Sequence, residues 1–204
     1  DTSLAGSMVS TYAVPKNLIA RQEITGSTSD PTVVTFSDVP QTYDHLELSI
    51  YARTDRDSQP LDYVYMEFND DATSANYPRQ VLRGAATTAS AFQQDNDAVL
   101  TITGNTGTAN AFGSGAVTIY NYTKTDRHTH RLSAGGHDGI VELISSRWEN
   151  TAAVTKIHLH NAAADDFQVG SVFELRGIHS TVAAAATDIE TINGIAAADI
   201  EAVN

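Results

Sequence analysis

The sequence contains no cysteine, so disulfide bonds, thiolate nucleophiles and cysteine-ligated zinc are all excluded. Basic residues are also scarce: 12 lysines and arginines stand against 25 aspartates and glutamates, which gives a formal net charge of −13. A field of that sign repels phosphate backbones and anionic lipid headgroups. We therefore expect neither nucleic acid nor a membrane as a partner.

Long apolar runs and familiar catalytic motifs are missing as well. No apolar run approaches the roughly 18 residues that a membrane-spanning helix needs, and the first residues lack the basic and then apolar order of a secretory signal. The nucleophile elbow, the phosphate-binding loop, the dinucleotide loop and the H-E-x-x-H zinc motif do not occur. We expect a soluble protein that is not an enzyme and binds no cofactor.

What the sequence has in quantity is short segments that alternate between apolar and polar residues. The chain is 41% hydrophobic and only 18% charged, a composition that favours a folded β protein over a disordered one. The alternation has the period of a strand with one buried face. The expected strands cover residues 18–24, 32–36, 45–53, 63–68, 77–83, 99–103, 116–122, 131–133, 140–144, 155–160 and 171–176.

Two of these segments carry expectations of their own. Pro78 cannot donate a ladder hydrogen bond, so the strand at 77–83 is expected at a sheet edge. Residues 84–96 are rich in Ala, Thr and Gln with weak periodicity, and we expect them to form a long surface loop.

Residues 148–178 contain the single tryptophan and two strong strand candidates, and we expect the rest of the chain to be organised around them. We expect these two strands to form a hairpin that closes the domain, with His158 and His160 facing outward. The core expected from the alternation comprises Leu46, Leu48, Ile50, Val64, Met66, Phe68, Trp148, Ile157, Leu159, Phe173 and Leu175.

Short strands separated by turns, with no helix expected before residue 180, predict an all-β fold, an antiparallel β-sandwich or jelly roll. We expect it to cover residues 16–179, after an extended N-terminal arm at 1–15. The sequence D-I-E-T-I-N at 188–193 recurs eleven residues later as D-I-E-A-V-N. Residues 180–204 are therefore expected to be a short helical or extended tail, either a linker or a segment that assembles with neighbouring subunits.

Two His-x-His pairs, His128 with His130 and His158 with His160, each place two imidazoles on one face of a strand. Such a pair can bind one metal ion, and three copies in a homotrimer could complete the site. No carboxylate or cysteine stands at a familiar ligand spacing, however. Solvent-facing histidines are the favoured interpretation, and no metal is expected.

Tyr51, Tyr63 and Tyr65 fall on the faces opposite the apolar residues of their strands. Together they could form an aromatic platform for sugar rings. The simpler interpretation is that tyrosine has a high strand propensity and tolerates half-covered positions.

Short motifs follow one another in a distinctive order along about residues 12–178. They are L-I-A at 18–20, V-T-F-S-D-V-P-Q-T-Y-D-H-L at 34–46, A-R-T-D-R at 52–56, F-N at 68–69, Tyr77, I-Y-N-Y at 119–122, W-E-N-T-A-A-V at 148–154 and F-Q-V-G-S-V-F-E-L-R-G-I at 167–178. In this order they resemble a family of tailed-bacteriophage virion structural proteins. The resemblance implies a small β-sandwich module and offers no catalytic residues.

From this resemblance we expect a structural component of the virion, in a tail fibre or appendage or on the capsid, that acts in assembly and host-surface attachment. It would assemble in the host cytoplasm as a homo-oligomer, a trimer, with other virion proteins and host glycans as partners. A capsid decoration protein is the alternative. A free lectin or a carbohydrate-active enzyme is less favoured, and the enzyme would need two carboxylates about 5 to 9 Å apart across a cleft.

Overall fold

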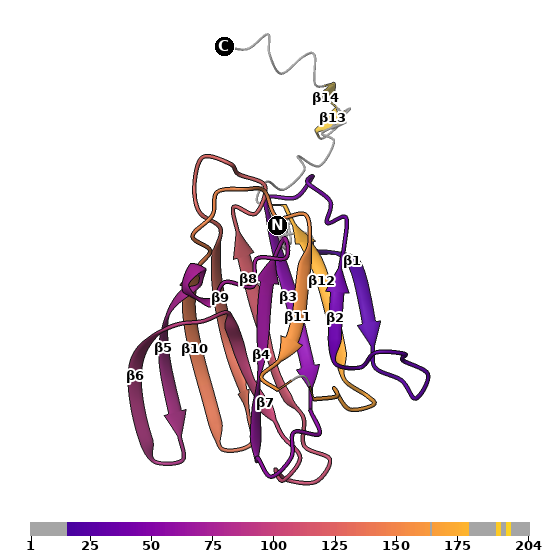
Figure 1. Cartoon of the computed structure of the whole chain (residues 1–204). Coiled ribbons are helices and arrows are strands. Elements are labelled where there is room, and N and C mark those ends of the chain that lie inside the picture. Colours follow the sequence, from indigo (N-terminus) through magenta and orange to yellow (C-terminus); the bar gives the residue numbers. More distant parts are fainter. Residues whose placement is uncertain (1–15, 164, 180–190, 193–194, 197–204) are drawn as a thin grey trace, which may run out of the picture.

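The computed structural model describes residues 16–163, 165–179, 191–192 and 195–196. The arm predicted for residues 1–15 and most of the tail predicted for 180–204 lie outside the described residues. The described chain folds into two antiparallel sheets packed face to face, the smaller in front of the larger in Figure 1. The all-β sandwich predicted from the sequence is confirmed. No helix in the described part of the chain has the length and apolar character that crossing a membrane requires.

The larger sheet has eight strands in the order β1-β12-β3-β8-β9-β10-β5-β6. Their bounds are Lys16–Glu23 for β1, Val172–Ile178 for β12, His45–Ala52 for β3, Gly113–Tyr120 for β8, His130–His137 for β9, Ile140–Arg147 for β10, Pro78–Ala85 for β5 and Thr88–Asp95 for β6.

The smaller sheet has four strands in the order β2-β11-β4-β7. They are β2 (Val33–Phe36), β11 (Ile157–Asn161), β4 (Leu61–Phe68) and β7 (Ala98–Thr103). A 3-10 turn, η1, covers Ser74–Asn76. The short strands β13 (Thr191–Ile192) and β14 (Ile195–Ala196) pair with each other. Ile192 and Ile195 are therefore opposite one another in a ladder.

The space between the sheets is filled by the apolar side chains of the alternating segments, because each strand turns one face toward the other sheet. Each core residue expected from the alternation is buried: Leu46, Leu48, Ile50, Val64, Met66, Phe68, Trp148, Ile157, Leu159, Phe173 and Leu175.

Strand β7 is buried along its whole length because the large sheet covers both of its faces. On one face, Leu100 packs over Gly115 and Gly135, a cross-strand pair in β8 and β9. On the other, the Thr101 hydroxyl donates to Glu142 Oε2 of β10 at 2.6 Å. The far strands of the large sheet therefore wrap around this edge of the small one.

The prediction that residues 148–178 contain a closing hairpin is wrong. Strand β11 pairs with β2 and β4 in the small sheet, while β12 pairs with β1 and β3 in the large sheet. The two strands face each other across the core instead of lying side by side. Alternation shows that a strand has one buried face, and it carries no information about the strand's neighbours.

The prediction of a surface loop at 84–96 is also wrong. Most of this segment is strand β6, which forms a hairpin with β5. Nearly every residue of β6 is exposed, so its sequence has no apolar face to mark it as a strand. Because β6 pairs with β5 alone, β6 forms the edge of the large sheet and β5 is an interior strand. Pro78 is the first residue of β5, a position where a strand tolerates proline.

Candidate functional site

An apolar surface covers the outer face of the large sheet at β9, β10 and β5, the strands at the left of Figure 1. Four large side chains on it are between 40% and 64% exposed: Leu82, Leu132, Val141 and Leu143. We call these four residues, with Ala134, the outer apolar patch. Leu143 is the centre of the patch, since it pairs with Leu82 of β5 and with Ala134 of β9.

Glycines shape this patch. Val141 stands opposite Gly84 of β5 and Gly136 of β9, so no neighbouring side chain covers it on either flank. A hollow of about 530 Å³ results over Leu82, Val141 and Leu143. The patch is therefore both apolar and open, which suits it to receive side chains from another protein.

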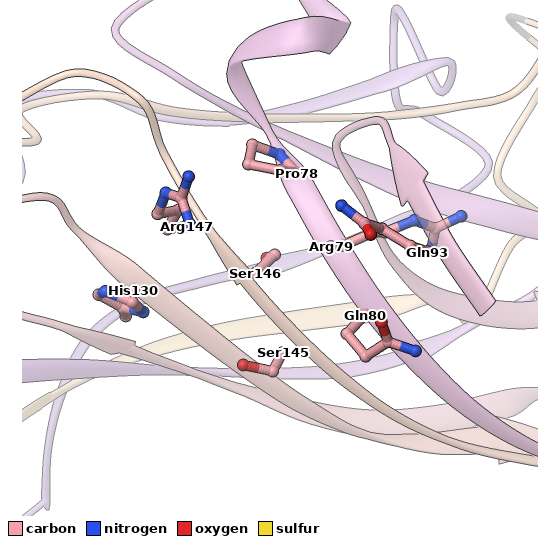
Figure 2. Close-up of a pocket in the computed structure, with 8 residues that line it drawn as sticks. All are labelled: Pro78, Arg79, Gln80, Gln93, His130, Ser145, Ser146 and Arg147. Carbon is pink, nitrogen blue, oxygen red and sulfur yellow. The ribbon is translucent and has the colours of Figure 1, made fainter. Parts of the chain in front are cut away.

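The same outer face turns polar toward the other end of these strands. A hollow of about 300 Å³ lies there. Figure 2 shows His130 and Arg147 on one side of it and Gln80 and Gln93 on the other. Ser145 pairs with Leu132 of β9 and with Gln80 of β5, so the polar hollow is continuous with the outer apolar patch. An apolar centre with a polar border is the usual composition of a protein–protein interface.

A second candidate site lies on the outer face of the small sheet, where His160 of β11 meets two carboxylates. Its Nε2 atom is 3.2 Å from Glu67 Oε1 and 3.4 Å from Asp97 Oδ2. We call Glu67, Asp97 and His160 the carboxylate–histidine cluster. Burial lowers the pKa of His160, but Asp97, the Asn161 carbonyl and Glu67 outweigh burial and hold that pKa above its ordinary value.

Three strands position this cluster. Tyr65 of β4 pairs directly with His160 and stacks on its ring at 5.2 Å, and Glu67 is the diagonal neighbour two residues further along β4. Asp97 is the last residue before β7, beside a bulge in the pairing of β4 with β7. Its carbonyl accepts the Met66 N–H at 3.0 Å, which fixes this part of the backbone.

The structure does not gather the histidines of the two His-x-His pairs into one centre. His158 Nδ1 lies 3.0 Å from the Thr35 hydroxyl of the neighbouring strand, and the ring centroids of His158 and His160 are 5.8 Å apart. His128 Nδ1 lies 3.0 Å from the Trp148 carbonyl, while His130 lines the polar hollow. Of the four histidines, His160 alone lies between two carboxylates.

The three tyrosines do not share a surface either. Tyr51 lies on the outer face of the large sheet, stacked on Phe112 at 4.8 Å. Tyr63 and Tyr65 lie on the outer face of the small sheet, with ring centroids 6.3 Å apart, and Arg83 covers Tyr63. The hypothesis that all three tyrosines form a single aromatic platform is therefore wrong.

Sequence reasoning missed Glu67 and Asp97 because both are distant from His160 along the chain. The one available signal was that Glu67 alternates with Met66 and Phe68, as His160 alternates with Leu159, which places both on the outer faces of their strands. Nothing in the sequence indicated that β4 and β11 are neighbours.

Comparisons with protein families, with curated proteins and with solved structures found no match to this chain.

Proposed function

We propose that this protein is a non-enzymatic structural component of a tailed-phage virion, a β-sandwich that acts by assembling with further copies of itself and with other virion proteins. Two observations support the proposal: the order of motifs along residues 12–178, and the outer apolar patch. The patch carries the argument. Its four large apolar side chains lie together on one sheet face, where exposure to water is unfavourable unless another protein covers them.

A second copy of this chain is the occupant that the charges favour. Two chains that each carry a net charge of −13 repel one another over most of their surfaces. An uncharged surface avoids this repulsion at the point of contact. The outer apolar patch is such a surface, because Leu82, Leu132, Ala134, Val141 and Leu143 are all uncharged.

Repetition of this contact by symmetry, in a trimer, would give strong attachment from individually weak interfaces. Such assembly suits both a capsid decoration protein and a tail-appendage protein. The two differ in whether the remaining surface also binds the host. Host attachment through sugars can use an exposed aromatic ring on which a sugar stacks, and Tyr51 with Phe112 offers one. Binding on a glycan array that is lost in Tyr51→Ala would favour the tail, and density on the phage head would favour decoration.

A matched pair of substitutions tests the assembly. Val141 in the patch and Val169 in the loop before β12 are both 64% exposed. Val141→Glu adds a charge to the proposed interface, and Val169→Glu adds the same charge elsewhere. Light scattering of the purified full chain should give the mass of a trimer for the wild type and for Val169→Glu, and that of a monomer for Val141→Glu. A monomeric wild type, or equal behaviour of the two variants, would refute the proposal.

A further inference from the structure

The carboxylate–histidine cluster has the spacing of a coordination shell. Metal–ligand distances of about 2.1 Å to imidazole nitrogen and carboxylate oxygen place neighbouring ligand atoms about 3.0 to 3.4 Å apart in octahedral or tetrahedral geometry. His160 Nε2 lies 3.2 Å from Glu67 Oε1 and 3.4 Å from Asp97 Oδ2. One ligand atom from each residue lies within 4.8 Å of the others.

The other ring nitrogen of His160 is already engaged. Nδ1 lies 3.0 Å from the Asn161 carbonyl oxygen, which can accept only if Nδ1 carries the proton. The neutral ring then presents the lone pair of Nε2 to the two carboxylates. A histidine that donates one N–H to a carbonyl and directs its free nitrogen outward is the arrangement found at metal sites, where the hydrogen bond fixes the tautomer and the ring orientation.

Asp97 supplies an independent observation. Its side chain is only 7% exposed, and its Oδ2 atom is buried without a hydrogen-bond partner. His160 Nε2 is likewise buried without a hydrogen-bond partner, and its contacts with the two carboxylates are ion pairs only when the ring is protonated. Two buried polar atoms that face one another unsatisfied are costly, and a cation between them would satisfy both.

We propose that Glu67, Asp97 and His160 bind one divalent transition-metal ion, with zinc as the best fit. One imidazole and two carboxylates suit zinc and its neighbours, whereas calcium and magnesium take oxygen ligands alone. Three protein ligands leave a position for water. Because the ligands come from β11, β4 and the turn before β7, the ion would fasten three strands of the small sheet together. This proposal does not depend on the proposed function.

Calorimetric titration of the full chain with zinc chloride, after removal of metal with a chelator, tests the site. His158 gives a control, since it lies on the same face of β11, directly opposite Glu67, but contributes no ligand atom to the cluster. We expect one zinc per chain in the wild type and in His158→Gln, and binding at least about tenfold weaker in His160→Gln. Zinc should also raise the melting temperature of the wild type and of His158→Gln, but not that of His160→Gln, and magnesium chloride should do neither.

Glu67→Gln provides a second variant if His160→Gln does not fold, and it should weaken zinc binding as well. The proposal is overturned if the wild type binds zinc no more tightly than about 100 μM, an affinity that surface histidines could provide. It is also overturned if His160→Gln binds zinc as the wild type does, or if His158→Gln loses as much affinity as His160→Gln.

Discussion

Trp148 donates its indole N–H to Asp71 Oδ2 at 2.7 Å, so the single tryptophan is tied to the turn that follows β4. Asp71 also accepts hydrogen bonds from Asn76 Nδ2 and from the Thr73 N–H. Burial raises the pKa of Asp71, but these hydrogen bonds outweigh it and hold that pKa below its ordinary value. The carboxylate is therefore the form that the folded protein prefers.

The first prediction concerns this carboxylate. Because the folded-state pKa lies below the unfolded value of about 3.9, the stabilisation is fully present above that pH and is lost as the pH falls through the folded-state pKa. Asp71→Asn should lower the free energy of unfolding by about 1.5 to 3 kcal/mol at pH 7. Urea denaturation monitored by circular dichroism measures the difference, which should shrink below about pH 4.

Asp70→Asn is the control for this measurement, because Asp70 is exposed and its partner is Lys156 at the surface. A surface ion pair contributes about 1 kcal/mol at most. If Asp71→Asn and Asp70→Asn lose the same stability, or if the loss in Asp71→Asn does not depend on pH, the role given to Asp71 is incorrect.

The second prediction concerns Gly135, where the sheets approach closely. A Cβ atom added there would lie 2.6 Å from Gly115 Cα and 2.6 Å from Leu100 Cδ1. The backbone contact cannot be relieved by a rotamer change, so Gly135→Ala should cost about 2 to 3 kcal/mol. At Gly26 nothing lies within 4 Å of the added atom, and Gly26→Ala should be nearly neutral. Chemical denaturation of both variants checks this, and equal stabilities would contradict the packing described for β7.

The third prediction concerns Arg131, which is buried in the core region of β9. Its guanidinium donates to the Met66 carbonyl at 2.7 Å and to the Ser146 hydroxyl at 2.9 Å, and it lies 4.7 Å from the Tyr77 ring centroid. Burial lowers the pKa of Arg131 to about 10, so the side chain is still charged at neutral pH.

Arg131→Ala would leave a cavity and deprive the Met66 carbonyl and the Ser146 hydroxyl of their donor. We expect a loss of about 3 kcal/mol or more in the free energy of unfolding. Arg127 is exposed and pairs with its neighbour Asp126, so Arg127→Ala should change stability by about 0.5 kcal/mol or less. Thermal melts compare the two, and a stable Arg131→Ala variant would contradict the structural role of Arg131.

Alternation in the sequence predicted the strands that have one buried face, such as β3 and β4, because burial itself creates the pattern. The strands expected at 131–133 and 140–144 fall inside β9 and β10, which are both longer than expected. The pattern failed at β6, which is exposed on both faces and so shows no alternation.

Strand neighbours could not be predicted from the pattern. Strands β11 and β12 are consecutive and similarly patterned, yet they belong to different sheets. The carboxylate–histidine cluster depends on the pairing of β4 with β11 and on the bulge before Tyr65, so it could not be found from the spacing of residues along the chain. The outer apolar patch was hidden for the same reason, since Leu82, Leu132 and Leu143 are brought together only by the order of β9, β10 and β5.

The proposed role in a virion is tested most directly by finding where the chain is located. Cells that produce phage particles carrying this gene can be lysed and the particles purified by density gradient, then examined by mass spectrometry and immunogold electron microscopy. We predict that the chain sediments with the particles in many copies and that the label lies at regular positions on the head or the tail. A chain that remains in the soluble fraction, with no label on intact particles, would contradict the proposal.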